Sequence, residues 1–104
     1  MKRARSILIV EDEVVIRTTL RELLAGEGYF VATAGCVAEA IQLSSERDFD
    51  VSICDVQLPD GDGVGLIRRL RQRNPDLATL IITAYATVEN AVEAFKAGAF
   101  DYLV

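Results

Sequence analysis

The sequence predicts an α/β fold in three layers, with a doubly wound parallel β-sheet between helices. Short continuous apolar runs, which are typical of strands buried on both faces, alternate with segments of helical apolar spacing. The segments between these runs are long enough to join parallel strands by right-handed crossovers. The chain has 104 residues, of which 51% are hydrophobic, so we expect a single domain over residues 1–104.

The first half of the chain predicts two strands and two helices. The apolar runs at 7–10 and 29–33 predict the strands. The first helix has apolar residues at i, i+4, i+7 and i+8, namely Ile16, Leu20, Leu23 and Leu24. Gly26 and Gly28 end this helix. The second helix has a weaker apolar face, which consists of Val37, Ala40, Ile41 and Ser44.

The second half repeats the alternation. A third strand at 51–54 leads into a turn at 56–63 that is rich in Gly, Pro and Asp. Leu66, Ile67 and Leu70 form the inner face of a third helix, whose arginines lie largely outside. The dipeptide 74–75, Asn-Pro, ends it. A fourth strand (80–83), a fourth helix with its N-cap at Thr87 and a fifth strand (100–104) follow.

Composition limits the possible functions. The net charge of −5 argues against direct contact with nucleic acid by this domain. The first apolar run, 7–10, is too short for a signal peptide or a membrane span, so we expect no membrane association and a cytoplasmic location. Cys36 and Cys54 lack metal or redox spacing, and we interpret both as reduced core residues.

Polar side chains follow the strands at their carboxyl ends, where open parallel sheets bind ligands. Glu11 and Asp12 follow the first strand, Asp55 the third, and Thr83 ends the fourth. If the first and third strands are neighbours, the carboxylates converge, and their mutual repulsion favours a shared cation. Hard oxygen ligands suit Mg²⁺, and a metal-activated carboxylate beside a hydroxyl is suited to forming an aspartyl-phosphate.

Each residue also has a simpler interpretation when it is taken alone. Asp55 could cap the turn, and Glu11 and Asp12 could complement the positive N-terminus of the first helix. Thr83 could be an ordinary β-branched strand residue, and Tyr102 a packing aromatic. The joint placement of these residues at strand ends favours a functional site.

Four motifs together resemble the receiver domain of bacterial two-component response regulators. They are residues 7–13, residues 51–55 with Leu-Pro at 58–59 and Asp-Gly at 62–63, residues 82–84, and residues 98–103. The resemblance implies a flavodoxin-like fold with strand order 2-1-3-4-5. The run 83–89 is similar to receivers attached to enhancer-binding transcription activators.

The resemblance also implies a role for each matching residue. Asp55 would be the phosphoacceptor, Asp12 and Asp55 would bind Mg²⁺ directly, and Glu11 would act through a metal-bound water. The backbone carbonyl of Gln57 would complete the protein's share of the ligands. Thr83 would donate a hydrogen bond to a phosphoryl oxygen. Tyr102 would be the aromatic residue that changes rotamer when Thr83 moves.

The implied function is that of a phosphoacceptor module, not a turnover enzyme. It would accept a phosphoryl group from a sensor histidine kinase or phosphotransfer protein and control an output domain or downstream partner. A homodimer could form through the face of the fourth helix and fifth strand. The family places Lys-Pro directly after the position of Val104 and then a fifth helix. We therefore expect a C-terminally truncated domain with the final helix missing, an exposed apolar patch and impaired charge neutralisation during transfer.

Two other functions fit a layered α/β fold. A Mg²⁺-dependent small phosphohydrolase resembling the haloacid dehalogenases would need a second Asp two residues after the nucleophile. Gln57 occupies that position, and its amide cannot shuttle a proton. A flavodoxin-like FMN binder would need a phosphate loop after the first strand, where the acidic run 11–13 would repel the phosphate.

Overall fold

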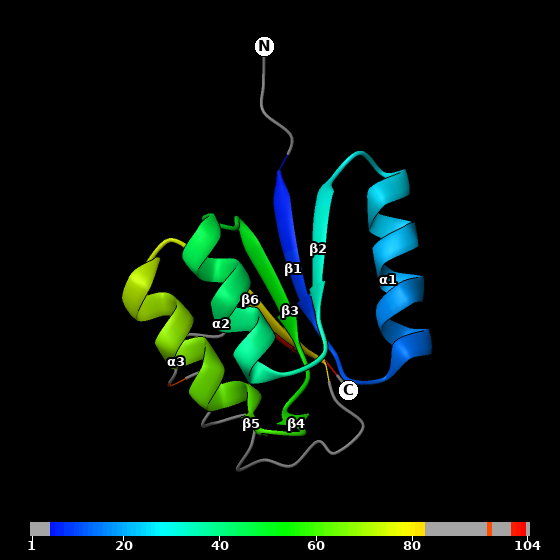
Figure 1. Cartoon of the computed structure of the whole chain (residues 1–104). Coiled ribbons are helices and arrows are strands. Elements are labelled where there is room, and N and C mark those ends of the chain that lie inside the picture. The colour runs from blue at the N-terminus through cyan, green and yellow to red at the C-terminus, as the bar shows by residue number, and fades with distance from the viewer. Residues whose placement is uncertain (1–4, 83–95, 97–100, 104) are drawn as a thin grey trace.

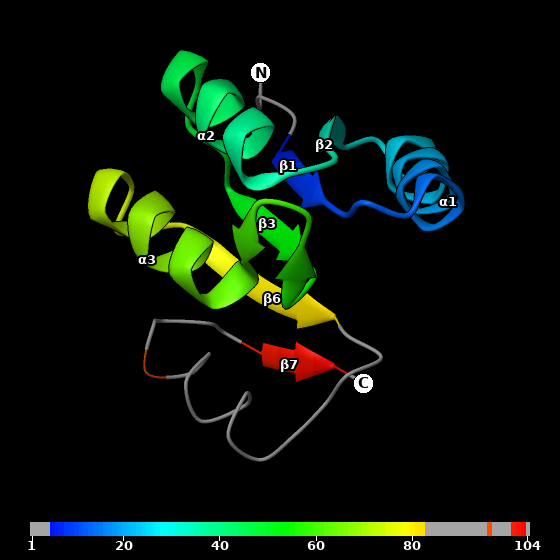
Figure 2. The same ribbon diagram turned by 60° about the horizontal axis from the view of Figure 1, so that its bottom comes forward.

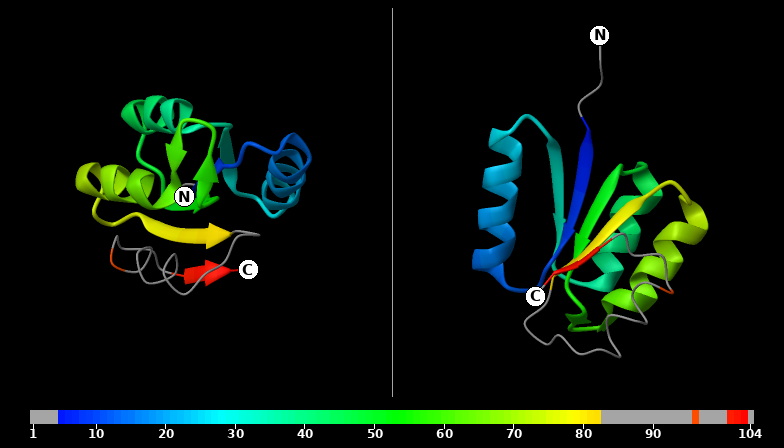
Figure 3. Two further views of the ribbon diagram at one scale, coloured as in Figure 1. Left: turned by 90° about the horizontal axis from the view of Figure 1, so that it is seen from below. Right: turned by 180° about the vertical axis from the view of Figure 1, so that it is seen from behind.

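The computed structural model describes residues 5–82, Lys96 and residues 101–103. Within this part of the chain, five parallel strands form one sheet in the order β2-β1-β3-β6-β7 (Figure 3). The strands are β1 (Ser6–Val10), β2 (Phe30–Ala34), β3 (Val51–Cys54), β6 (Ala78–Ile82) and β7 (Asp101–Leu103). Because β6 and β7 are the fourth and fifth strands of this sheet, the predicted order 2-1-3-4-5 is confirmed.

Helices lie on both faces of the sheet, as the three-layer prediction requires. The helix α1 (Val14–Gly26) lies against one face, whereas α2 (Val37–Glu46) and α3 (Gly63–Arg73) cover the other (Figure 1). Figure 2 shows the sheet between these two helix layers. The predicted fourth helix, with its N-cap at Thr87, lies outside the described residues. Among the helices described, none combines the length and the apolar composition that crossing a bilayer requires.

The main hydrophobic core lies between the sheet and the layer of α2 and α3. Leu8 and Val10 of β1 point into it, because alternate residues of a strand face the same side. From α3, the side chains of Leu66, Ile67 and Leu70 are buried in the same cluster. The predicted inner face of the third helix is therefore confirmed. Burial of a side chain of this size contributes about 1.5–3 kcal/mol.

The predicted first helix is confirmed, but its apolar residues are covered only in part. Leu20 and Leu24 are partly buried, but Ile16 is 47% exposed and Leu23 is 63% exposed. The reason is the position of α1, which packs mainly against β2, the edge strand of the sheet, and so presents a narrow stripe to it. Part of the apolar surface of α1 consequently remains open in the described structure.

The turn predicted after the third strand contains an antiparallel hairpin that was not predicted. The strands β4 (Gln57–Leu58) and β5 (Gly61–Asp62) pair with each other across a two-residue loop, Pro59-Asp60. Strands this short carry too few residues for an alternating pattern to be recognised in a sequence. This hairpin lies at the carboxyl end of the sheet (Figure 1). Only Val56 separates it from Asp55 in the chain.

The two cysteines differ in their surroundings. Cys54 is buried in β3, as predicted, and burial raises the pKa of its thiol. Cys36 is only partly buried, and the interpretation of Cys36 as a core residue is wrong because it is the N-cap residue of α2. Both cysteines are free thiols.

A buried hydroxyl in β3 leads to a stability prediction. The Oγ atom of Ser52 is buried and has no hydrogen-bond partner among the described residues. We expect Ser52→Ala to raise the free energy of unfolding by about 1 kcal/mol, because alanine removes an unsatisfied polar group. Urea denaturation measures this difference.

Ser6 provides the matched control for Ser52. It is equally buried, but its Oγ lies 3.3 Å from Oδ2 of Asp50 and 3.4 Å from the carbonyl oxygen of Asp48. We therefore expect Ser6→Ala to lower the free energy of unfolding by about 1–2 kcal/mol. Equal losses in both variants would show that Ser52 is satisfied in solution.

Candidate functional site

The sheet register brings the residues after β1 and β3 together. Val10 is paired with Cys54, so the chains leave these two neighbouring strands side by side. The ladder extends one step further, because the backbone N–H of Asp55 donates to the carbonyl oxygen of Val10 at 3.1 Å. On the other side of β1, the N–H of Glu11 donates to the carbonyl oxygen of Ala34 at 3.0 Å. Backbone hydrogen bonds therefore fix Glu11 and Asp55 as neighbours.

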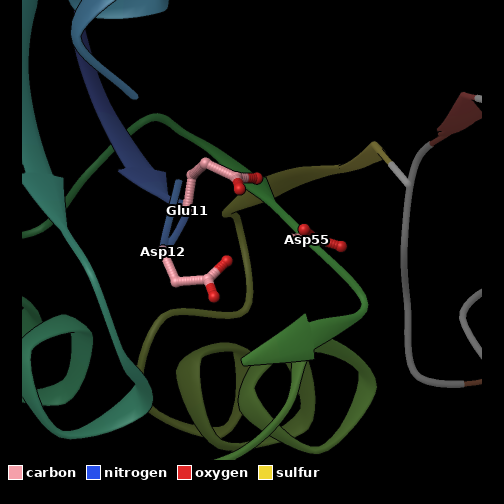
Figure 4. Close-up of side chains that lie close together, drawn as sticks. All are labelled: Glu11, Asp12 and Asp55. Atoms are coloured by element: carbon pink, nitrogen blue, oxygen red, sulfur yellow. The ribbon is translucent and has the colours of Figure 1, made fainter. Parts of the chain in front are cut away.

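The three carboxylates predicted to converge lie together in the structure. Glu11, Asp12 and Asp55 each offer one oxygen atom, and these atoms all lie within 4.8 Å of one another. Figure 4 shows the three side chains projecting toward a common space beyond the strand ends. Glu11 is buried, Asp55 is partly buried and Asp12 is exposed, so the cluster is open to solvent on one side.

The simpler interpretation of Glu11 is partly correct as well. Its Oε1 accepts a hydrogen bond at 3.1 Å from the backbone N–H of Glu13, the N-cap residue of α1. The acidic side chain therefore stabilises the start of the helix while it lies beside Asp55. Both interactions use the same carboxylate, so they do not exclude each other.

Burial raises the pKa of Glu11 to about 7. The hydrogen bond from Glu13 opposes this shift, and the negative charges of Asp55 and Asp12 add to it. A carboxyl group that is costly to ionise beside two others is the electrostatic situation that a bound cation relieves. Without a bound cation, the three carboxylates therefore repel one another electrostatically.

The donor set fits a Mg²⁺ ion that keeps some of its waters. Two oxygen atoms bound directly to one Mg²⁺ ion can be at most about 4.2 Å apart, since each bond is about 2.1 Å long. The oxygen atoms of the three carboxylates lie within 4.8 Å of one another, which is close to this limit. The set therefore suits direct binding by some of the carboxylates and binding through water by another, as the resemblance implies for Glu11.

The raised pKa of Glu11 leads to a prediction for cation binding. A proton on Glu11 competes with the ion, so we expect the affinity for Mg²⁺ to rise roughly tenfold between about pH 6 and about pH 8. Calorimetric titration with Mg²⁺ at both values measures the change. In the control Glu11→Gln, which cannot ionise, the affinity should vary much less with pH. An equally steep pH dependence in that variant would assign the titration to another group.

The structure describes only some of the remaining residues that were predicted for the site. Gln57 begins β4, and its backbone N–H donates to Oδ1 of Asp55 at 3.3 Å, which places it next to the cluster. Tyr102 belongs to β7, where its backbone is paired with that of Ile81, but its side chain lies outside the described structure. Thr83 also lies outside the described residues.

Sequence reasoning missed several residues that shape the site. Arg17 of α1 donates from Nη1 to the backbone carbonyl of Glu11 at 3.0 Å, which supports the loop that carries two of the carboxylates. Asp62 is the N-cap of α3, and its Oδ1 accepts from the N–H of Gly65 at 2.6 Å. An Asp three residues before a glycine and an apolar run was a usable N-cap signal. Nothing in the sequence indicated the contact of Arg17.

The fold and the site define a doubly wound α/β domain with an acidic cluster around an aspartate at the end of a central strand. The chain belongs to the family of response regulator receiver domains, whose family model matches residues 7–104. It is 44% identical over 98 residues to the transcriptional regulatory protein ZraR of Escherichia coli O157:H7. That match covers 94% of this chain and 22% of ZraR, so the chain spans about a fifth of the length of this relative.

Solved structures agree with this assignment. A CheY-like receiver domain protein from Methanospirillum hungatei JF-1 superposes with a TM-score of 0.94 at 31% identity, over 97% of this chain and 81% of that one. A response regulator from Burkholderia pseudomallei superposes with a TM-score of 0.91 at 34% identity, over 95% of this chain and 58% of that one. The latter structure contains a phosphorylated aspartic acid, a calcium ion and citrate.

The family assignment decides between the functions that the sequence left open. The chain is a phosphoacceptor receiver module of two-component signalling, and the phosphohydrolase alternative is not supported. The predicted flavodoxin-like class is likewise confirmed by the similarity to CheY-like structures.

Proposed function

We propose that Asp55 is the residue of this chain that accepts the phosphoryl group. The observation that carries the proposal is the convergence of Glu11, Asp12 and Asp55 within 4.8 Å at the ends of two neighbouring strands. Asp55 leaves the central strand β3 and is partly exposed, so a phosphoryl donor can reach it. A phosphorylated aspartic acid in the similar structure from Burkholderia pseudomallei supports this choice.

The transfer we propose is an in-line displacement. A carboxylate oxygen of Asp55 attacks the phosphorus of a phosphohistidine, the P–O bond forms, and the P–N bond breaks with its electron pair passing to the imidazole. The donor is a sensor histidine kinase or a phosphotransfer protein. Asp12 and Asp55, the backbone carbonyl of Gln57 and, through water, Glu11 would hold Mg²⁺. When bound, Mg²⁺ offsets the charge on the phosphoryl oxygens.

The acyl phosphate carries roughly two negative charges where the Asp55 carboxylate carried one, in a cluster that is already acidic. Thr83 donates a hydrogen bond to a phosphoryl oxygen, the adjoining loop shifts, and Tyr102 changes rotamer. This change is a shift between existing conformations, which an output domain or a downstream partner reads. A homodimer through the face of the fourth helix and fifth strand is one form that the readout can take.

The wider assignments follow from the same proposal. The chain promotes its own phosphorylation and dephosphorylation without acting as a turnover enzyme, and it works in the cytoplasm without direct contact with nucleic acid. Its similarity to ZraR, a transcriptional regulatory protein, supports an output that regulates transcription.

Mass spectrometry tests the proposed acceptor. After incubation with acetyl phosphate and Mg²⁺, we expect the chain to gain the mass of one phosphoryl group, and peptide mapping to place it on Asp55. Omission of Mg²⁺ should prevent the gain. A phosphoryl group on another residue, or equal labelling without Mg²⁺, would contradict the proposal.

A further inference from the structure

The tip of the β4–β5 hairpin is fixed to the start of α2 by Asp60. Its Oδ1 accepts a hydrogen bond from the backbone N–H of Val37 at 2.7 Å, and its Oδ2 accepts one from Ala38 at 3.1 Å. These N–H groups belong to the first turn of α2, where backbone donors have no partner within the helix. Cys36, the N-cap residue of α2, makes no side-chain capping bond. Asp60 therefore provides the cap from a different segment of the chain.

This contact is favourable for a charged carboxylate although Asp60 is exposed. The N–H of Val37 first, and that of Ala38 next, hold the pKa of Asp60 below its ordinary value. The positive end of the helix dipole acts in the same direction. The hairpin also packs closely on α2 here, since a Cβ atom at Gly61 would lie 3.1 Å from Cγ2 of Val37.

The hairpin is attached at its other end too. Asp62 caps α3 through the N–H of Gly65, and Gln57 is paired with Asp62 across the two short strands. Gln57 also donates its backbone N–H to Asp55. Two aspartates of one short hairpin therefore connect it to the two helices on this face of the sheet, and the backbone of Gln57 lies between these attachments and the acidic cluster.

We propose that Asp60 is a positioning residue, which fixes the hairpin so that the backbone carbonyl of Gln57 is held ready for the divalent cation. The inference rests on the proposed function, because it requires a cation at the cluster of Glu11, Asp12 and Asp55. Groups that orient metal ligands lower the cost of ordering the site when the ion binds, and their loss commonly weakens binding by 10–100-fold in metalloproteins.

Calorimetric titration with Mg²⁺ tests the proposal on four forms of the chain. We expect Asp60→Ala to weaken Mg²⁺ binding by about tenfold. Asp60→Asn, which keeps one acceptor oxygen, should give an intermediate loss. The control Asp76→Ala removes the same charge from an exposed residue after α3, ahead of β6, and should bind Mg²⁺ like the wild type.

Val37→Pro separates positioning from the simple loss of a negative charge. Proline removes the N–H that donates to Asp60 but keeps the carboxylate, and Val37 is the first residue of α2, where proline is tolerated. The extended backbone of Cys36 is also compatible with a following proline. We expect this variant to weaken Mg²⁺ binding and, in ¹H–¹⁵N spectra, to shift the Gln57 amide while that of Gly65 stays in place.

The outcomes distinguish the inference from the function on which it rests. Unchanged Mg²⁺ binding in Asp60→Ala and Val37→Pro would overturn the positioning role. A loss in Asp60→Ala and Asp60→Asn that Val37→Pro does not share would overturn it as well, since the effect would then be one of charge. If Asp60→Ala does not fold, Asp60→Asn and Val37→Pro decide. A wild-type chain that binds no Mg²⁺ would refute the proposed function together with this inference.

Discussion

Replacement of Asp55 by asparagine is expected to reduce phosphorylation by acetyl phosphate and Mg²⁺ to background. The amide of asparagine is too weak a nucleophile to attack phosphorus, and it also removes one negative charge from the cation site. The fold should survive, because the amide oxygen of asparagine can still accept a hydrogen bond from the backbone N–H of Gln57. Oδ1 of Asp55 accepts this bond at 3.3 Å. Intact-mass measurement over time, with thermal denaturation of the same sample, separates loss of the acceptor from loss of the fold.

Asp62→Asn is the matched control for this experiment. Asp62 lies in the same loop but outside the cluster of three carboxylates, and an asparagine there retains the oxygen that caps α3. We expect Asp62→Asn to be phosphorylated at close to the wild-type rate. Strong labelling that persists in Asp55→Asn would move the acceptor to another residue.

Replacement of Gly63 by alanine is expected to destabilise the domain by about 3 kcal/mol. A Cβ atom at Gly63 would lie 2.1 Å from the backbone oxygen of Asp55 and 3.1 Å from Sγ of Cys54. The first of these contacts is with backbone, which cannot move away without displacing Asp55. The variant should therefore lose Mg²⁺ affinity in addition to stability, and urea denaturation with Mg²⁺ titration measures both.

Gly26→Ala is the control for Gly63→Ala. A Cβ atom at Gly26, the last residue of α1, meets no atom within 4 Å. We expect its free energy of unfolding to stay within about 1 kcal/mol of the wild type, with a small gain because alanine restricts the unfolded chain. A similar loss of stability in both variants would show that the close approach of Gly63 to Asp55 is not the cause of the effect.

The fold was predictable because the apolar strand runs and the helical spacing between them indicate the same architecture. The continuous apolar run at 7–10 is typical of a strand buried on both faces, and Leu66, Ile67 and Leu70 match the period of a helix that covers such a sheet. Parallel strands then bring their carboxyl ends to one edge. This is why the acidic cluster could be predicted from residues that are more than 40 positions apart in the chain.

The structural features that the sequence did not predict depend on contacts that follow no regular spacing along the chain. The bond from Asp60 to the start of α2 spans more than 20 positions and uses the backbone of α2, which the sequence does not identify as a partner. The exposure of Ile16 and Leu23 follows from the position of α1 at the edge strand, which apolar spacing does not specify. Spacing shows that a helix has an apolar face, but not how much of that face its neighbours cover.

The central claim is that carboxylates from two separate strands share one divalent cation beside the phosphoacceptor. A crystal structure of the chain with Mn²⁺, located by its anomalous scattering, tests it most directly. We expect one ion, bound directly by Asp12, Asp55 and the carbonyl oxygen of Gln57, with Glu11 on a metal-bound water. An ion bound elsewhere, with the cluster empty at the same Mn²⁺ concentration, would contradict the claim.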